Sequence, residues 1–180
     1  MPMSATFHEI PIEGLRVELN RVIIDKRGIL MRLAPRGISK VENIIGVLLL
    51  KKGVPRGGHY HFKRYDQGWV VLGTAILYFY DFRKDSSSFG KSWAVLVGRE
   101  GFKLTSALAE IPDLTVKTTQ KIAKILIPPG VYHLIIPLKA PVVFLEVASE
   151  RYSEKDYQRI DLRQIQDPVL EKIKKFYVKS

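Results

Sequence analysis

Hydrophobic residues along the chain gather in short runs that are separated by glycine, proline, aspartate and serine. In order, the runs read RVIID, GILMRL, NIIGVLLL, HYHF, GWVVLG, AILYFYDF, SWAVLV, AKILIP, YHLIIP and VVFLEVA. Many short apolar segments bounded by turn residues, with little helical periodicity, are typical of a β-barrel or β-sandwich. The pattern therefore predicts an all-β protein.

The run AILYFYDF is apolar on both of its faces. Ile76, Tyr78 and Tyr80 alternate with Leu77 and Phe79. Side chains two positions apart in a strand share a face, so neither face of this segment is left for solvent. We expect a strand that is buried on both sides.

Helical periodicity is confined to the end of the sequence. Asp167 followed by Pro168 is typical of a helix N-cap with proline at the first helical position. An apolar stripe follows, formed by Val169, Leu170, Ile173, Phe176 and Tyr177. This spacing predicts a short C-terminal helix that packs on the barrel.

The segment 98–124 is too long for a tight hairpin between the strands that flank it. We expect an excursion with a short helix or strand of its own, and we regard it as a candidate lid. The sequence has no internal repeat, low-complexity tract or linker composition. A single domain over residues 1–180 is therefore expected.

Composition limits the kinds of chemistry that are available. The chain of 180 residues is 46% hydrophobic and 26% charged, as in an ordinary globular protein, and it contains no cysteine. Any metal site must therefore use His, Asp or Glu. The net charge of +11 is spread along the chain without a nucleic-acid-binding motif, which favours a solvated basic surface, able to attract phosphorylated ligands, over nucleic-acid binding.

No segment has the pattern of a signal peptide or of a membrane-spanning helix. The N-terminus lacks a basic start followed by a continuous apolar stretch. We therefore expect a soluble, cytoplasmic protein that has no membrane partner.

Two histidines in the stretch Gly-His-Tyr-His form the main candidate site. His59 and His61 are two positions apart on an expected strand and so share a face. Asp66 follows after a short turn, either as an ordinary turn residue or as a ligand. His133 begins a later strand after a Pro-Gly turn at Gly130. If the two strands are neighbours, these side chains surround one point, where packing, metal binding and proton transfer are all open.

The spacing of these residues resembles the two cupin motifs. The matching positions are Gly53-x5-His59-x-His61-x4-Asp66-x6-Gly73 and Pro128-x-Gly130-x-x-His133. The resemblance implies a cupin-type jelly-roll barrel, or double-stranded β-helix, with its site in the mouth of the barrel.

A narrower resemblance concerns several segments that follow one another along the chain. KKGVPRGGHYH is similar to the KKGVLRGLHYQ stretch of the dTDP-4-dehydrorhamnose 3,5-epimerase family, and DKRG, DFRKDSSSFGKSW and IPPGVYH also resemble segments of that family. The resemblance implies metal-free proton abstraction beside the 4-keto group of a nucleotide-linked deoxysugar. It implies that His59 is the base, that His133 is a second pocket histidine, and that Arg27 and Arg56 bind phosphate. It also implies a homodimer.

The sequence departs from that family at several positions. The tyrosine that donates a proton in the family falls on Glu146, which becomes a candidate acid or base. The family's lysine before the position of Gly73 has no counterpart here. The segment EVASERYSEKDYQRI instead resembles the Ala-Ser-x-x-Tyr-x-x-x-Asp-Tyr segment of the sugar 3,4-ketoisomerases, which also carry Arg-Gly-x-His-x-His. Within this segment Tyr152 is a candidate for stacking on the nucleotide base.

The sequence thus supports one main hypothesis and two alternatives. The main hypothesis is an epimerase-like enzyme that uses His59, His61, His133 and Glu146 on a nucleotide-sugar substrate, without a cofactor. The first alternative is a sugar 3,4-ketoisomerase, which is favoured by His61 where the epimerases have glutamine. The second is a metal-binding cupin, either an enzyme or a binding module, with His59, His61, Asp66 and His133 around a divalent ion.

Overall fold

The computed structural model describes residues 5–6, 10–98, 114–118 and 121–176. The strands are β1 (Ala5–Thr6), β2 (Arg16–Asp25), β3 (Gly28–Met31), β4 (Asn43–Leu49), β5 (Arg56–His61), β6 (Asp66–Asp81), β7 (Ser92–Gly98), β8 (Leu114–Thr118), β9 (Lys121–Ile127), β10 (Val131–Ala148) and β11 (Tyr157–Arg159). The helices are two 3-10 turns, η1 (Glu154–Asp156) and η2 (Leu162–Gln164), and α2 (Pro168–Lys174).

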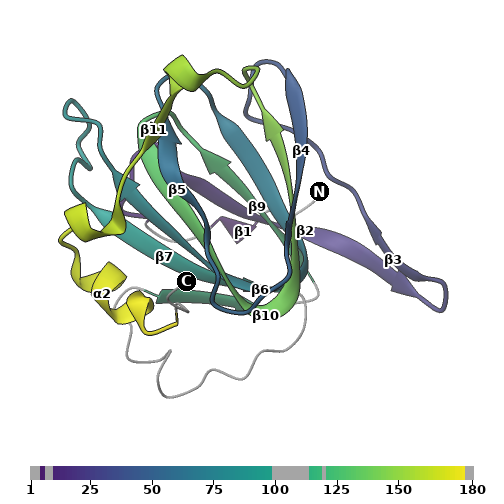
Figure 1. The fold of residues 1–180 in the computed structure, drawn as a ribbon. Coiled ribbons are helices and arrows are strands. Elements are labelled where there is room, and N and C mark those ends of the chain that lie inside the picture. Colours follow the sequence, from purple (N-terminus) through teal and green to yellow (C-terminus); the bar gives the residue numbers. More distant parts are fainter. Residues whose placement is uncertain (1–4, 7–9, 99–113, 119–120, 177–180) are drawn as a thin grey trace.

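The strands form a cupin-type jelly-roll barrel around two long, antiparallel central strands, β6 and β10 (Figure 1). β10 also pairs with β4 and β5, and β6 also pairs with β7 and β9. β11 continues the sheet on the far side of β5. This order places β5 between β10 and β11, so side chains from three strands that are distant in sequence can meet at one end of the barrel.

Each central strand joins two of the apolar runs in the sequence. Gly73 lies at the bend of β6 with a φ of +78°, and a Cβ there would lie 2.3 Å from the carbonyl oxygen of Pro141. The β6–β10 register shifts on either side of Lys139, next to Pro137 and Pro141. Glycine and proline interrupt the apolar pattern at these points, so each bent strand resembles two short strands in the sequence.

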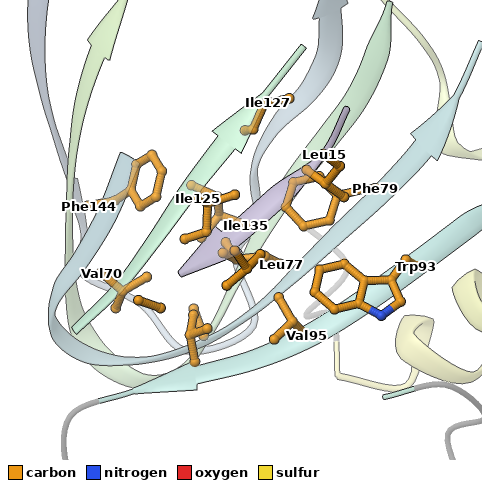
Figure 2. Close-up of a cluster of buried hydrophobic side chains, with 14 of the residues drawn as sticks. Leu15, Val70, Leu77, Phe79, Trp93, Val95, Ile125, Ile127, Ile135 and Phe144 are labelled. Atoms are coloured by element: carbon orange, nitrogen blue, oxygen red, sulfur yellow. The ribbon is translucent and has the colours of Figure 1, made fainter. Parts of the chain in front are cut away.

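The main hydrophobic core fills the barrel (Figure 2). Leu77 and Phe79 of β6 face this core, whereas Ile76 and Tyr78 face a second cluster between the barrel and α2. The predicted burial of this segment on both faces is confirmed. Each large side chain buried in this way contributes about 1.5–3 kcal/mol to folding.

Helix α2 begins at Pro168, and Asp167 is its N-cap, as predicted. The Asp167 carboxylate accepts hydrogen bonds from the backbone N–H of Leu170 at 2.8 Å and from the hydroxyl of Tyr78 at 3.0 Å. Val169, Leu170 and Ile173 are buried in the second cluster, and Phe176 packs against it. The cap therefore also binds the helix to the barrel. Tyr177, the last member of the expected stripe, lies outside the described residues.

The segment after β7 is described only in part. Strand β8 runs parallel to β7, so the excursion contributes a strand to the sheet. The candidate lid falls mostly on residues 99–113 and 119–120, which lie outside the described residues. Within the described part of the chain, no helix is long and apolar enough to cross a membrane.

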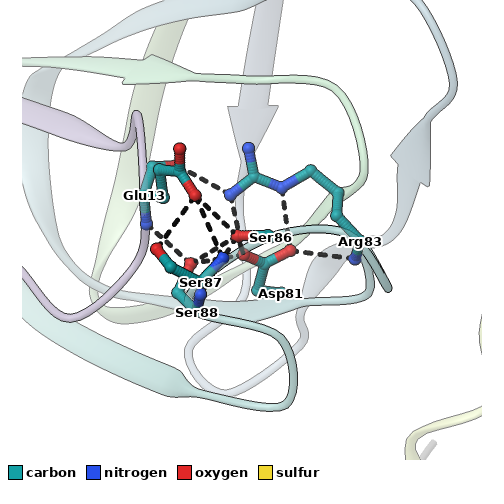
Figure 3. A network of polar contacts seen from close by, with 6 residues as sticks. All are labelled: Glu13, Asp81, Arg83, Ser86, Ser87 and Ser88. Atoms are coloured by element: carbon teal, nitrogen blue, oxygen red, sulfur yellow. Dashed lines mark hydrogen bonds and ion pairs between the residues drawn. The ribbon is translucent and has the colours of Figure 1, made fainter.

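A polar network fixes the turn after β6 (Figure 3). The Asp81 carboxylate accepts hydrogen bonds from Arg83 at 2.7 Å, Ser86 at 2.8 Å and Ser88 at 2.5 Å. Burial acts to raise the pKa of Asp81, but the hydrogen bonds from Arg83 and the serines outweigh it and lower the pKa to about 2. Glu13 joins the network through Ser86 at 3.1 Å. The DFRKDSSSFG segment is thus held by its own side chains and by the N-terminal part of the chain.

Candidate active site

Three histidines converge where β5 faces β10. His59 pairs with His133 in the β5–β10 register, and their ring centroids are 4.5 Å apart. The His61 ring lies 5.0 Å from the His59 ring and 6.0 Å from the His133 ring. One ring nitrogen from each histidine can be chosen so that all three lie within 4.8 Å of one another. The convergence that the cupin spacing predicts is therefore present.

Glycines before His59 allow the two strands to approach each other. Gly57 has a φ of +95°, and a Cβ at this position would lie 2.7 Å from the carbonyl oxygen of His133. The β5–β10 register shifts between His133 and Leu134, opposite this glycine. A side chain at position 57 would push β5 away from β10, so the glycine sets the spacing of the imidazoles.

The histidines line a pocket of about 490 Å³ that also involves β4 and β11. This volume lies in the range of small-ligand sites. Apolar side chains of Ile45, Val47 and Ile135 form part of the wall. The remaining lining side chains are polar, charged or aromatic, so the pocket can orient a polar ligand against an apolar surface.

Most of the residues singled out from the sequence line this one pocket: His59, His61, His133, Glu146, Arg56 and Tyr152. Arg27 does not. It lies after β2, in the turn that leads to β3, where its Nη2 is 2.6 Å from Oδ2 of Asp25. Within a single chain the structure therefore does not bring Arg27 to the histidines.

A buried arginine that the sequence reading missed lies behind the histidines. Arg64, only 6% exposed, donates from Nε to Asp66 and from Nη2 to Glu146. Asp66 is 1% exposed and Glu146 is 9% exposed. Asp66 is the first residue of β6 rather than a turn residue, and its Oδ2 lies 3.6 Å from Nε2 of His61 and 4.0 Å from Nε2 of His133.

Burial gives the three imidazoles unusually low pKa values. Burial and then the charge of His61 lower the pKa of His59 to about 4, and burial and then Arg64 lower that of His61 to about 4. Burial, followed by the other two histidines, lowers the pKa of His133 well below 6.5. All three rings are therefore neutral near neutral pH and can accept a proton.

The carboxyl groups shift in the opposite direction. Burial, together with the charge of Glu146, raises the pKa of Asp66 well above its ordinary value, although Arg64 opposes this. Burial also raises the pKa of Glu146 against the opposing effect of Arg64. Asp66 and Glu146 share the single guanidinium of Arg64. These two acids can therefore hold one exchangeable proton between them, next to the imidazoles.

Backbone carbonyl groups fix the tautomers of two of the histidines. Nδ1 of His61 lies 2.9 Å from the carbonyl oxygen of Asp156, and Nδ1 of His133 lies 3.2 Å from that of Val131. A carbonyl oxygen only accepts hydrogen bonds, so each Nδ1 carries the proton and each Nε2 presents a lone pair. Both Nε2 atoms lie next to Asp66.

Strand β11 adds two pocket residues that sequence reasoning did not identify. Arg159 pairs with His59 in the β5–β11 register, and the Tyr157 ring lies 4.5 Å from the His59 ring. The Tyr152 ring lies 6.5 Å from that of Tyr157. The alternation of Tyr157 and Arg159 on a strand was the available signal, but nothing in the sequence pairs that short strand with β5.

The arginines differ in whether an acidic residue neutralises them. Arg27, Arg83 and Arg163 each bind the aspartate two positions before them. Arg56 and Arg159 line the pocket and make no ion pair with any residue that the structure describes. They therefore provide free positive charge for an anionic ligand, and guanidinium groups bind phosphate oxygens in a fork-like geometry.

Comparison with known proteins agrees with this description at the level of fold. No protein-family model matches the sequence, and no curated protein sequence matches it. Solved structures do match, and sugar-nucleotide epimerases and isomerases are among them. These structures place the chain in the cupin-type fold class.

Three of these structures illustrate the range. A dTDP-4-dehydrorhamnose 3,5-epimerase from Sulfolobus tokodaii is 21% identical with a TM-score of 0.68, over 93% of this chain and 87% of that one. A dTDP sugar isomerase from Desulfovibrio desulfuricans G20 is 20% identical with a TM-score of 0.67, and the match covers 91% of this chain and 92% of that one. A sugar 3,4-ketoisomerase from Thermoanaerobacterium thermosaccharolyticum, solved with TDP, is 19% identical with a TM-score of 0.59. The match covers 91% of this chain and 98% of that one. Because each of these structures is only 19–21% identical to this chain, the likeness shows the fold alone.

Proposed function

We propose that this protein is a sugar-nucleotide epimerase or isomerase that moves protons next to the keto group of a 4-keto-6-deoxyhexose carried on dTDP. The observation that carries the proposal is the meeting, in one pocket, of three neutral imidazoles and two arginines that have no ion-pair partner among the described residues. The reaction needs a base that removes the proton, a group that stabilises the enolate oxygen and cationic side chains that bind the diphosphate. The pocket offers side chains for all three roles.

In this proposal His59 is the base. A C–H bond next to a ketone breaks when its proton passes to an imidazole and the electron pair moves onto the ketone oxygen, which forms an enolate. With a pKa of about 4, His59 is unprotonated but weakly basic in the free protein. A bound diphosphate between Arg56 and Arg159 adds negative charge nearby, which raises the pKa of His59 toward the range that suits a base.

The other pocket groups complete the cycle. His61 or His133 is the second proton relay or stabilises the enolate oxygen, and Glu146 takes the position of the missing tyrosine as an acid. Return of a proton to the opposite face of the same carbon gives epimerisation. Transfer between neighbouring carbons, with the matching shift of the ketone, gives isomerisation. Tyr152 and Tyr157 offer aromatic surface to the nucleotide base.

The 3,5-epimerase and the 3,4-ketoisomerase differ in which carbons exchange hydrogen with solvent. The test is incubation of the protein with dTDP-4-keto-6-deoxyglucose in D₂O, followed by NMR. Deuterium at both C3 and C5 supports the epimerase. A 3-keto product that carries deuterium at C4, with no exchange at C5, supports the ketoisomerase, which the second histidine of the pair favours. Absence of exchange at every protein concentration would contradict the substrate proposal.

Assembly as a homodimer is part of the proposal. The β2–β3 hairpin extends from the barrel (Figure 1) and exposes Ile23, Ile24, Ile29 and Leu30. Ile23 pairs with Leu30 and Ile24 with Ile29, so each face of the hairpin carries an exposed apolar pair. Exposed apolar side chains grouped in this way are commonly covered by a partner. Light scattering on the purified protein tests this, and a monomeric mass at micromolar concentration would contradict it. We also propose that the enzyme acts in the cytoplasm.

A metal-binding cupin is the second candidate function, and it is favoured by the distances among His59, His61 and His133. Neutral imidazole nitrogens suit zinc, manganese or iron, and an ion bound there would polarise a ligand oxygen. The acid that would complete the set, Asp66, is bound to Arg64 instead. Elemental analysis of the purified protein separates the candidates, because a stoichiometric transition metal would contradict the metal-free mechanism.

A further inference from the structure

We infer that Arg64 occupies the electrostatic place of a metal ion in this pocket, and that replacing it with an uncharged side chain creates a divalent-cation site. The inference concerns a residue that neither the sequence motifs nor the proposed reaction assigns. It rests on the proposed metal-free function, because it explains why the histidine cluster works without an ion.

The three imidazoles come close to the arrangement that a cation needs. Their ligand nitrogens lie within 4.8 Å of one another, whereas nitrogens around a tetrahedral zinc ion are about 3.4 Å apart. His61 and His133 are oriented by carbonyl groups that hold the proton on Nδ1, which leaves the lone pair of each Nε2 available to a metal ion. A small inward movement of side chains would complete a three-nitrogen site.

Both carboxylates next to the histidines already bind Arg64. Asp66 has one oxygen beside the histidines, 3.6 Å from Nε2 of His61, and gives its other oxygen to Arg64. Glu146 binds the same guanidinium. Arg64 therefore balances one of the two acid charges, and the proton that the acids can share balances the other. Its permanent positive charge also lies in a buried region, where it repels a second cation.

Removal of the Arg64 charge makes cation binding in this pocket favourable. Without Arg64, two carboxyl groups remain buried with no cationic partner, which is unfavourable unless they are protonated or bind a cation. Asp66 would then be free to join His59, His61 and His133. Three imidazoles and one carboxylate form a donor set that suits cobalt, zinc, manganese or iron.

Cobalt binding to the full-length protein tests the inference. Wild type and Arg64→Met are treated with a chelator and titrated with Co²⁺, and binding is followed by visible absorption and by elemental analysis. We expect Arg64→Met to bind about one Co²⁺ per chain, with an affinity about 100-fold or more above that of wild type. His133→Ala in the Arg64→Met background should remove the signal, because it deletes one donor.

Two further variants control for charge and for folding. Arg64→Lys keeps a buried cation and should bind cobalt no better than wild type. Arg64→Met combined with Glu146→Gln removes one of the stranded acids but keeps Asp66, so it should fold and bind cobalt even if the single variant unfolds. Circular dichroism and thermal melting confirm that each protein is folded.

The outcomes separate this inference from the proposed function. Tight, stoichiometric cobalt binding by wild type overturns the role of Arg64, and so does the absence of a gain in both folded proteins expected to bind, Arg64→Met and Arg64→Met with Glu146→Gln. Deuterium exchange by wild type without that gain of cobalt binding would reject this inference alone. A gain of cobalt binding without deuterium exchange by wild type would reject the proposed reaction alone.

Discussion

His59 and His133 pair across the β5–β10 ladder with their ring centroids 4.5 Å apart. One lies in the middle of a short strand and the other near the start of a long one, and neither ring is charged near neutral pH. The two neutral imidazoles are in edge-to-face contact and line the same pocket, so a ligand bound there can exchange a proton with either ring.

The spacing of β5 and β10 should depend on Gly57. In Gly57→Ala, the new Cβ would lie 2.7 Å from the carbonyl oxygen of His133, on a backbone with a φ of +95°. We expect a loss of about 1–3 kcal/mol in the free energy of unfolding and slower deuterium exchange, because β5 must move away from β10. Gly46→Ala in β4 is the control, since nothing lies within 4 Å of its Cβ position. Equal behaviour of the two variants would contradict the close approach.

The pocket arginines should bind the diphosphate. Replacing Arg56 or Arg159 with alanine removes a charged hydrogen-bond donor, so each change should weaken dTDP binding by about tenfold or more. Isothermal titration calorimetry measures this directly. Arg163→Ala is the matched control, because Arg163 is exposed and already paired with Asp161. If all three variants lose affinity equally, the effect is one of net charge and not of the pocket.

The pH dependence of exchange should reflect the low pKa of the base. Burial and the neighbouring His61 place the pKa of His59 at about 4 in the free protein, below its ordinary value of 6.5. The acid limb of kcat/KM, which reports the free enzyme, should therefore fall near pH 4 and not near pH 6.5. Exchange rates measured at low substrate concentration test this, and an acid limb near pH 6.5 would show that the base is solvated.

Stability should also depend on the protonation of His61. Its folded-state pKa of about 4 lies below the unfolded value of 6.5, so the unfolded chain binds more protons between these values and stability is lost as the pH falls from 6.5 to 4. Asp66 and Glu146 have raised pKa values and act in the opposite direction, since they favour the folded state in acid.

A variant separates these two contributions. His61→Gln removes the contribution of His61, while burial, the largest cause of the low pKa values of His59 and His133, remains. Between about pH 7 and about pH 5, wild type should lose about 2 kcal/mol more unfolding free energy than His61→Gln. Urea denaturation at the two pH values provides the measurement. An equal loss in both proteins would mean that His61 is not buried in its neutral form.

Phe144 is buried in the hydrophobic core inside the barrel (Figure 2). Its ring fills the space beside Gly68, where a Cβ would lie 2.0 Å from the ring. Phe144→Ala should therefore cost about 3–5 kcal/mol of unfolding free energy. Phe89→Ala, at an exposed position, should change stability little. Denaturant titration that gives similar losses for the two variants would contradict the packing.

The sequence predicted the parts of the site that depend on local periodicity. His59 and His61 share a face because strand side chains alternate, and the two motifs placed His133 beside them. Asp167 and Pro168 likewise predicted the start of α2, because capping is local. The fold class followed from the number of short apolar runs and from the cupin motifs.

The parts that were missed depend on pairing between distant strands. Arg64 acquires its role only when Asp66 and Glu146 are brought together by the β6–β10 ladder. Arg159 reaches the pocket because a three-residue strand pairs with β5. Arg27 was assigned to the site through resemblance, yet in the folded chain it binds Asp25 next to it in sequence.

Deuterium incorporation by His59→Asn tests the central claim most directly. Wild type and His59→Asn are incubated with dTDP-4-keto-6-deoxyglucose in D₂O at equal concentrations, and dTDP affinity is measured in parallel to show that the pocket is intact. We predict measurable exchange by wild type and a rate about 10²–10⁴-fold lower for the variant, because the base is removed. Equal exchange by both proteins would contradict the assignment of His59 as the base.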